Sequence, residues 1–192
     1  MYSLTRDNFN ETELESLDIK YIINNNSTSN NYLDVILQYQ LKGKNTSQKI
    51  INSLIINTSI DYCDNLNNIK ATAQDCRNGK NSKIIPNYIY DESFQVITWT
   101  FPFNEKGVEV NNEFEYCFSL DWKCFFDAKE LTQILIDPKN YSSNTKSINL
   151  SIENKSNLMI KQIQVYKFTR TPFDKQEPII LNKNTENTWK GV

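Results

Sequence analysis

Histidine is absent from the 192 residues of this sequence. Its absence excludes the Ser-His-Asp and Cys-His nucleophile systems, zinc bound through imidazole, and any switch that depends on histidine protonation. Glycine is also scarce, with four isolated residues, so the sequence contains no glycine-rich phosphate loop. Catalysis without these groups would depend on paired carboxylates or on Lys and Tyr side chains.

Neither sign of charge dominates, because 21 Lys and Arg residues oppose 23 Asp and Glu residues for a formal net charge of -2. The basic residues are scattered, whereas nucleic-acid binding needs a basic stripe. The most apolar stretch, residues 50–56, is interrupted by Asn52 and Ser53 and is far too short to cross a bilayer, and the first residues lack the apolar run of a signal peptide. We therefore expect a soluble protein with no membrane span and no nucleic-acid partner.

The four cysteines include no Cys-x-x-Cys pair, and their spacings do not match a zinc knuckle or ribbon. Cys117 and Cys124 flank Trp122 and could close a small disulfide loop. A bridge between Cys63 and Cys76 conflicts with a helix that the sequence predicts between them, because a helix of that length would hold the two residues too far apart. For that second pair, reduced thiols are the favoured interpretation.

Asparagine is abundant, with 27 residues, and together with the many Ile and Lys residues this composition is typical of an AT-rich genome. Eight Asn-x-Ser/Thr acceptor sequences occur, about twice the number expected by chance. They begin at Asn10, Asn25, Asn26, Asn45, Asn57, Asn140, Asn149 and Asn154. Such acceptors permit a secreted, glycosylated protein, so an extracellular, surface or particle-associated location is slightly favoured over a cytoplasmic one.

Alternation of apolar and polar residues predicts most of the fold. In residues 32–42, Leu37 and Tyr39 alternate with Gln38 and Gln40, which is the pattern of a half-buried antiparallel strand. Similar strand patterns occur in residues 19–23, 49–62, 88–90, 94–103, 114–120, 148–152 and 158–168. Seven or more strands with polar outer faces and short loops predict an all-β, two-sheet antiparallel β-sandwich or jelly roll.

Three segments interrupt this pattern with helical features. Asn10 and Glu13 form a capping box in a predicted helix over residues 7–18. A second helix is predicted between Asp64 and Gly79, where apolar residues recur at three- and four-residue steps, and a third over residues 127–137, before a proline. The sandwich is thus expected to carry one or two short helices inserted between strands.

The chain is expected to form one domain, because a single core serves a sequence of this length. We place the β-sandwich in residues 1–169 and a C-terminal extension or arm in residues 170–192. The second segment contains Pro172 and Pro178 and a single apolar trio, residues 179–181.

Several carboxylates are candidates for catalytic or metal-binding groups. The pairs are Glu113 with Glu115 and Asp121 with Asp127. A solvated outer strand face and a helix cap explain these pairs better than glycoside hydrolysis does. Asp61, Asp64 and Asp75 lie near the second predicted helix, but they lack the alternating Asx loop and central Gly of a calcium site. We therefore predict no catalytic residue, no metal site and no cofactor.

Aromatic side chains are the remaining binding resource. The candidates are Trp189, Tyr88, Tyr90, Trp122 and Tyr141, which could form a platform on which sugar rings stack. Trp99 and Trp122 share the parity of neighbouring apolar strand residues, which favours a core position for both. Trp189 lies outside the predicted strands and is therefore the best candidate for an exposed ring or a docking contact.

These observations favour a non-catalytic binding or assembly module, such as a structural or surface protein of the virion, tail or adhesin-like kind. Its expected partners are other protein subunits, including further copies of itself. The alternative is a carbohydrate-binding module that recognises a glycan with exposed aromatic residues and with Asn or Gln side chains. An enzyme with carboxylate or Lys and Tyr chemistry is the least favoured class.

Overall fold

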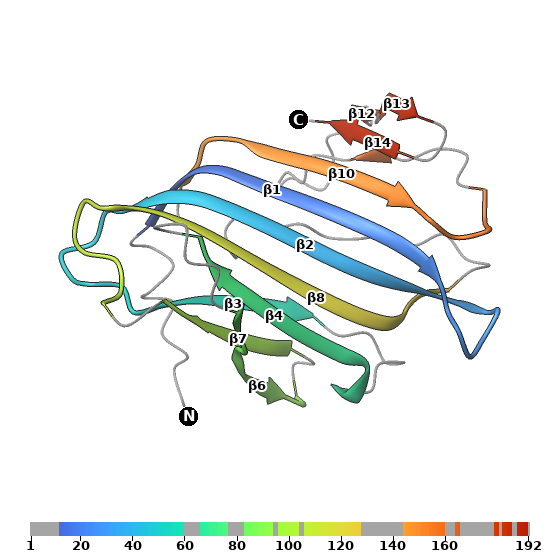
Figure 1. Cartoon of the computed structure of the whole chain (residues 1–192), viewed down its shortest axis with the longest axis horizontal. Coiled ribbons are helices and arrows are strands. Elements are labelled where there is room, and N and C mark those ends of the chain that lie inside the picture. The colour runs from blue at the N-terminus through green and yellow to red at the C-terminus, as the bar shows by residue number, and fades with distance from the viewer. Residues whose placement is uncertain are drawn as a thin grey trace.

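A computed structural model shows a protein built from β-strands (Figure 1). The described residues are 12–59, 66–76, 83–93, 96–103, 106–127, 144–159, 164–165, 179–180, 182–185 and 188–191. For residues 58, 59, 126 and 127, and for those after 159, the description covers the backbone alone. Within these ranges there is no α-helix, and the helical structure they contain is the single 3-10 turn η2 (Leu66–Asn68).

The larger of the two packed sheets has nine strands. They are β1 (Thr12–Asn25), β2 (Tyr32–Asn45), β4 (Ile69–Asp75), β5 (Lys83–Ile84), β8 (Glu113–Asp127), β9 (Asn144–Thr145), β10 (Ile148–Asn154), β13 (Asn182–Thr185) and β14 (Thr188–Gly191). Their order across the sheet is β13-β14-β10-β1-β2-β8-β4-β5, with β9 also paired to β1. Neighbouring strands are antiparallel except at β1, which runs parallel to β10 and to β9.

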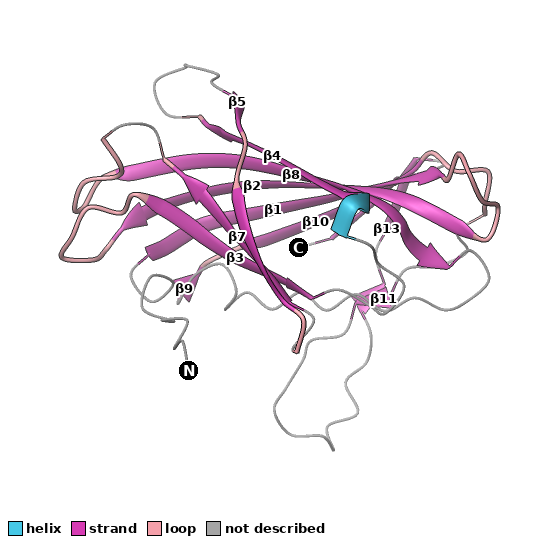
Figure 2. Cartoon of the chain, turned by 90° about the horizontal axis from the view of Figure 1, so that it is seen from below, coloured by secondary structure: helices cyan, strands magenta, loops and turns pink. Residues whose placement is uncertain are grey.

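The smaller sheet has three strands, β3 (Ser53–Ser59), β7 (Val96–Pro102) and β6 (Asn87–Asp91), in that order. Seen from below in Figure 2, β3 and β7 cross one face of the large sheet. Two further short strands, β11 (Gln164–Val165) and β12 (Ile179–Ile180), pair with each other. The structure thus confirms the predicted all-β, two-sheet and mostly antiparallel sandwich.

The core lies between the facing surfaces of the two sheets. Tyr39 of β2 stacks on Phe118 of β8 with ring centroids 4.3 Å apart, and Phe118 lies 4.6 Å from Phe101 of β7 in the other sheet. The Tyr116 hydroxyl donates a hydrogen bond of 2.9 Å to the carbonyl of Pro102, which ties the two sheets directly. Burial raises the pKa of this hydroxyl well above its usual value, so the group remains a donor at neutral pH.

The predicted helix over residues 7–18 is wrong wherever the structure describes it, because β1 begins at Thr12. A β-bulge between Leu14 and Ser16 shifts the register against β2, so Leu14 and Leu17 are both buried although they lie three residues apart. A three-residue spacing normally marks a helix, and here the bulge produces it within a strand. Residues 7–11 lie outside the described residues.

The predicted helix between Asp64 and Gly79 is also wrong over its described part. After η2 the chain forms β4, in which Ile69, Ala71 and Ala73 pair with inward-facing residues of β8. The four-residue step from Ile69 to Ala73 fits a strand as well as a helix, because both residues have the same parity. Pairing with β8 satisfies the backbone of this segment and buries these side chains. Of the third predicted helix, all but its first residue lies outside the described residues.

Strands also occur in residues 170–192, the predicted C-terminal extension. There β13 and β14 pair as a hairpin, and β14 joins the large sheet beside β10, at the top of Figure 1. Trp189, expected outside the strands, is in β14 and lies opposite Ile152 of β10. The division of the chain at residue 169 stays a prediction.

Asn45, at the end of β2, holds two connections against the sandwich. Its side chain is 0% exposed. The Oδ1 atom accepts hydrogen bonds from the backbone N–H and the hydroxyl of Ser47, and Nδ2 donates to the carbonyls of Lys49 and Val108, each at 2.8 Å. Val108 lies between β7 and β8, and Lys49 lies between β2 and β3. The Asn45 amide therefore joins these two connecting segments.

The same arrangement recurs at other Asn-x-Ser/Thr sequences. At Asn154, Oδ1 accepts from the N–H and the hydroxyl of Ser156, and Nδ2 donates to the carbonyl of Leu158. Asn26 accepts in the same way from Thr28. These sequences are therefore turns in which the side chain replaces backbone partners. A glycan on the buried Nδ2 of Asn45 or Asn154 would displace its hydrogen bonds, so the folded chain does not offer these two amides for glycosylation.

Replacing Asn45 by Ala should lower the free energy of unfolding by about 2–4 kcal/mol, because buried carbonyls and a buried N–H lose their partners. Urea denaturation followed by circular dichroism measures this change. The exposed Asn31 in the β1–β2 turn provides the control, and Asn31→Ala should change the value by less than about 0.5 kcal/mol. Equal unfolding midpoints for the two variants would show that the Asn45 turn contributes nothing to stability.

Candidate functional site

Three large apolar side chains are exposed within residues 85–89, which include the first part of β6. Ile85 is 80% exposed, Tyr88 52% and Ile89 64%. Pro86 between them is buried, and the Tyr88 ring lies 5.3 Å from the Trp99 ring. The segment is therefore anchored to the sandwich while its apolar side chains face solvent. We call Ile85, Tyr88 and Ile89 the β6 edge.

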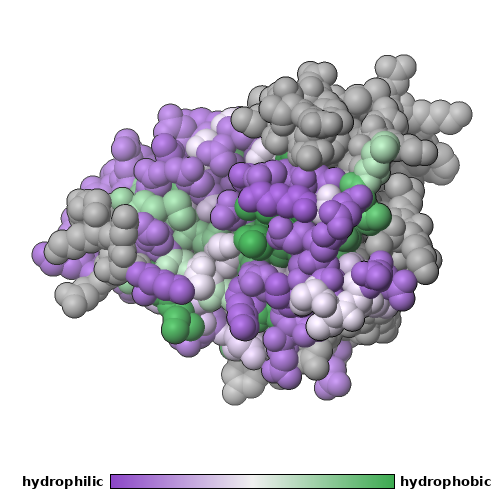
Figure 3. Space-filling model, turned by 45° about the vertical axis from the view of Figure 1, so that its right-hand side comes forward, coloured by the Kyte–Doolittle hydropathy of each residue, from purple (hydrophilic) through white to green (hydrophobic). Residues whose placement is uncertain are grey.

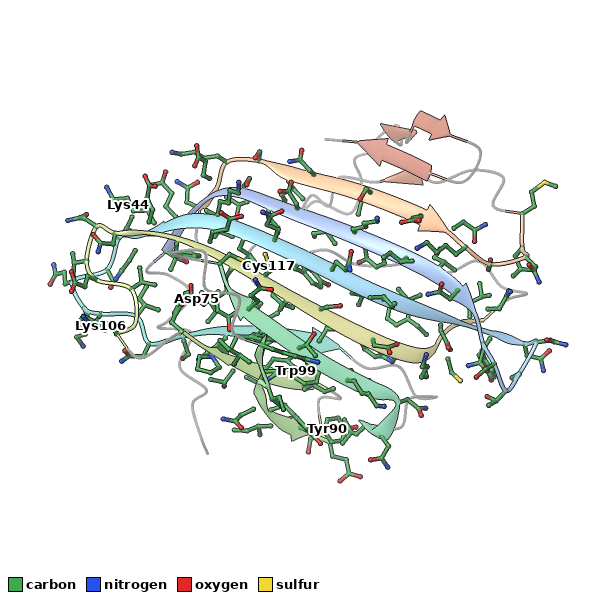
Figure 4. All side chains as sticks on the ribbon, viewed as in Figure 1. Lys44, Asp75, Tyr90, Trp99, Lys106 and Cys117 are labelled. Atoms are coloured by element: carbon green, nitrogen blue, oxygen red, sulfur yellow. The ribbon has the colours of Figure 1, made fainter. Side chains whose placement is uncertain are left out.

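β6 is an outer strand of the small sheet, since it pairs with β7 and no described strand pairs with its other side. The register places Tyr88 opposite Trp99, which is buried as predicted, and Tyr90 opposite Ile97, so both tyrosines share the core-facing side. Figure 4 shows Tyr90 and Trp99 on this sheet. Ile89 has the opposite parity and is on the outer side. The strand thus presents a backbone edge together with apolar side chains on both faces.

The structure separates the aromatic residues that the sequence singled out. Tyr88 is exposed and Tyr90 is half-buried against the core, and β6 brings these two together. Trp122, on β8, is 1% exposed, which confirms its predicted core position and leaves its ring no face for a ligand. Trp189 is described by its backbone alone, and Tyr141 lies outside the described residues.

Cys117 and Cys124 do not form the disulfide that the sequence left possible. Both are free thiols in β8, and seven residues of extended strand separate their Cα atoms by roughly 20 Å, against a limit near 7 Å for a bridge. Cys76, at the end of β4, is the thiol that approaches Cys117, with 3.0 Å between the two sulfur atoms. Sequence reasoning missed this pair because the helix predicted before Cys76 hid its pairing with β8. Cys63 lies outside the described residues.

Glu113, Glu115 and Asp121 lie on the outer face of β8, as predicted, whereas Asp127, predicted as a helix cap, is the last residue of the strand and its side chain is not described. Glu115 accepts a hydrogen bond from the Gln40 side chain and pairs with Lys42 at 3.8 Å. Asp121 pairs with a lysine at 3.5 Å on the same side of the strand. On the face drawn in Figure 3, hydrophilic residues predominate and apolar residues form separate spots. The carboxylates of Glu115 and Asp121 therefore take part in pairs along and across the strands of the large sheet.

The residues considered for calcium are only partly described. Asp75 is fully buried at the end of β4, whereas Asp61 and Asp64 lie outside the described residues. Among the residues that the structure describes, no three Cys, Asp or Glu side chains are grouped closely enough to hold a metal ion. The described part of the chain also has no helix long and apolar enough to span a bilayer.

A cleft of about 270 Å³ opens beside the turn between β1 and β2. Its lining residues are Asn25, Asn26, Ser29, Asn30, Tyr32, Leu33, Asn157 and Leu158. Four asparagine side chains line it around one half-buried tyrosine ring, and the amide of Asn26 is already engaged by Asp34 and Thr28. We call this site the asparagine cleft. The sequence did not indicate this cleft, because its lining residues are far apart in the chain.

Asp34 supports one wall of the asparagine cleft. Its carboxylate, in a residue only 4% exposed, accepts hydrogen bonds from Nδ2 of Asn26 at 2.6 Å, Nζ of Lys123 at 3.0 Å and the backbone N–H of Cys124 at 3.1 Å. The hydrogen bond from Lys123 raises the pKa of that ammonium group. Cys124 adopts a left-handed φ of 58°, which is unfavourable for a side chain of this kind, so Asp34 also fixes an irregular point of β8.

Comparisons with known proteins give no family for this chain. No protein-family model matches it, and no curated protein sequence is similar to it. Among solved structures, an M1 zinc metallopeptidase from Deinococcus radiodurans aligns with a TM-score of 0.46 and 7% identity, covering 94% of this chain and 38% of that one. A protein from Parabacteroides distasonis described as a protease aligns with a TM-score of 0.40 and 8% identity, covering 94% and 39%. The chain thus spans about two fifths of these proteins, and TM-scores this low support no argument about its function.

Replacing Asp34 by Ala should lower the free energy of unfolding by about 1–3 kcal/mol, because three donors lose one acceptor. Urea denaturation measures the loss. Asp18 provides a matched control, since its hydrogen bond to Asn149 is exposed, and Asp18→Ala should cost less than about 1 kcal/mol. A smaller loss for Asp34→Ala than for Asp18→Ala would contradict the supporting role given to Asp34.

Proposed function

We propose that this protein is a non-catalytic binding or assembly module that contacts other protein subunits through the β6 edge. It would act as a structural or surface component, of the kind found in virions, tails or adhesin-like domains. The observation that carries the proposal is the exposure of Ile85, Tyr88 and Ile89 beside a backbone edge that no described strand pairs. Exposed apolar groups of this kind mark contact surfaces in soluble proteins.

The sequence of β6 supports strand addition. Proteins usually protect an outer strand with lysine, proline or a bulge, because its unpaired N–H and C=O groups pair readily with another chain. Residues 87–91 read Asn-Tyr-Ile-Tyr-Asp, with no lysine and no proline inside the strand. In β3, the other outer strand of the small sheet, the exposed side chain among those described is the polar Asn57. The β6 edge is therefore the better surface for a partner strand.

A second copy of the chain is the partner that this strand fits. Antiparallel pairing of two β6 strands about Ile89 would place Asn87 opposite Asp91 and would bring no like charges together. The two copies would use the same surface, as in most homodimers. Ile89 would then lie beside its equivalent and lose much of its exposed apolar area.

The carboxylate geometry supports a role without catalysis. Glu115, one of the paired acids, is already engaged by Gln40 and Lys42 on the outer face of the large sheet. A glycosidase needs two carboxyl groups that face each other across a substrate. Neighbouring acids of one strand face, held by cross-strand partners, do not provide that arrangement.

Replacing Ile89 by Lys should weaken self-association by roughly tenfold or more, because the dimer would bury a charged side chain at its centre. Sedimentation velocity over a range of concentrations measures the dissociation constant. Met159 is 84% exposed but lies after β10, so Met159→Lys is the matched control and should leave association unchanged. A wild-type chain that stays monomeric at every concentration, or an Ile89→Lys variant that dimerises as well as wild type, would overturn the second copy as the partner.

The asparagine cleft supports a second candidate function, the recognition of a glycan. Amide groups and an aromatic ring are the side chains with which proteins hold sugar hydroxyls and sugar rings. The cleft gathers four asparagines around Tyr32, and none of its lining residues belongs to the β6 edge. This candidate does not use the exposed aromatic row expected from the sequence, because Trp122 is buried.

Titration of the protein with a panel of mono- and oligosaccharides should shift the NMR signals of the lining asparagine amides if the cleft binds sugar. Tyr32→Ala should abolish those shifts, because the ring supplies the stacking surface. Tyr88→Ala should leave them unchanged, since Tyr88 is on the small sheet. A panel that shifts no amide of the cleft would remove glycan recognition as a candidate.

A further inference from the structure

Two thiols meet on the outer face of the large sheet. Cys117 of β8 lies opposite Gln74 of β4, and the backbone N–H of Cys76 donates to the carbonyl of Glu115 at 2.9 Å. Cys76 and Cys117 are therefore diagonal neighbours on adjacent antiparallel strands, and their sulfur atoms are 3.0 Å apart. Both thiols are partly exposed. Figure 4 shows Cys117 on the same sheet as β4.

We propose that Cys76 and Cys117 form a reversible disulfide that fastens β4 to β8 when the protein meets a small-molecule disulfide such as oxidised glutathione. A disulfide has a sulfur–sulfur bond near 2.05 Å, so the two atoms need to approach by about 1 Å. Rotation of the two side chains supplies this movement while the strands stay paired. Partial exposure gives the oxidant access to the thiols.

The reaction balances as two exchange steps. The Cys76 thiolate attacks one sulfur of oxidised glutathione, forms a mixed disulfide and releases one glutathione thiolate. Cys117 loses its proton to solvent and attacks the Cys76 sulfur, which releases the second glutathione thiolate. Two protein thiols are thereby oxidised by two electrons, and one glutathione disulfide is reduced to two thiols.

The surroundings of Cys117 favour Cys76 as the first attacking thiol. Burial, helped by the hydrogen bond with Cys76 and the charge of Glu115, raises the pKa of the Cys117 thiol to about 12, although the charge of Lys42 acts in the opposite direction. Because the thiolate is the nucleophile, this shift disfavours Cys117 as the first attacker at neutral pH. In the second step the attack is intramolecular, and the closeness of Cys117 to the Cys76 sulfur compensates for its small thiolate fraction.

The crosslink would close a large loop of the chain. The two cysteines are 41 positions apart, and β5, β6 and β7 all lie between them. A bridge of this span restricts the unfolded chain and should raise the melting temperature by roughly 5–15 °C. It would also hold the start of the segment that leads to the β6 edge, although the proposal does not depend on the function of that edge.

The test uses the full chain with Cys63→Ser and Cys124→Ser, so that Cys76 and Cys117 are its only cysteines. After incubation with excess oxidised glutathione at pH 8, free thiols are alkylated and the protein is digested without reduction. Mass spectrometry should find a peptide that joins Cys76 to Cys117, and the melting temperature should rise and return on reduction. A further Cys117→Ser change should leave glutathione attached to Cys76 and abolish the rise.

Other outcomes would overturn the proposal. Full alkylation of both thiols after oxidation would show that they do not bridge, and so would glutathione retained on each of them. A wild-type digest in which Cys63 or Cys124 is joined to either residue in place of the Cys76–Cys117 peptide would assign the bridge elsewhere. None of these results would bear on self-association, which is measured in the reduced protein.

Discussion

The pairing of β2 with β8 is the constraint on which the sandwich depends. These two long strands lie at the centre of the large sheet and are paired over most of their length. Their register assigns Tyr39 and Phe118 to the core, and Gln40 and Cys117 to the outer face. A slip of one residue would exchange the two sets, which would bury amides and expose aromatic rings. The stacked Tyr39–Phe118 pair therefore fixes the register, and the outer face follows from it.

Most strands could be predicted from the sequence, because residue parity survives wherever the backbone is regular. Residues 114–120 keep one parity within β8 and were predicted correctly. Prediction failed where the parity breaks or is ambiguous. The bulge after Leu14 gives a strand the spacing of a helix, and the step from Ile69 to Ala73 fits both structures. Local pattern cannot separate these cases, since pairing with a distant strand decides them.

The candidate sites were less predictable than the strands, because each depends on the order of strands in a sheet. The sequence indicated a strand around Tyr88 but not that β6 would lie at an edge. It suggested a possible bridge between Cys117 and Cys124, which are close in the chain, whereas the structure places Cys76 beside Cys117. The asparagine cleft likewise gathers residues 25–33 and residues 157–158, which are far apart in the chain. Contacts between distant segments carry this information, and alternation within one segment does not.

The buried amide of Asn45 has a consequence for the synthesis of the chain. In a compartment that attaches glycans to growing chains, this acceptor sequence would be accessible before β2 has found its partners. A sugar added at that moment would stay attached and keep the turn from closing on Val108. Glycan transfer and folding would thus compete for one nitrogen atom. A chain made where no such transfer occurs would meet no competition, so the same turn makes folding sensitive to the route of synthesis.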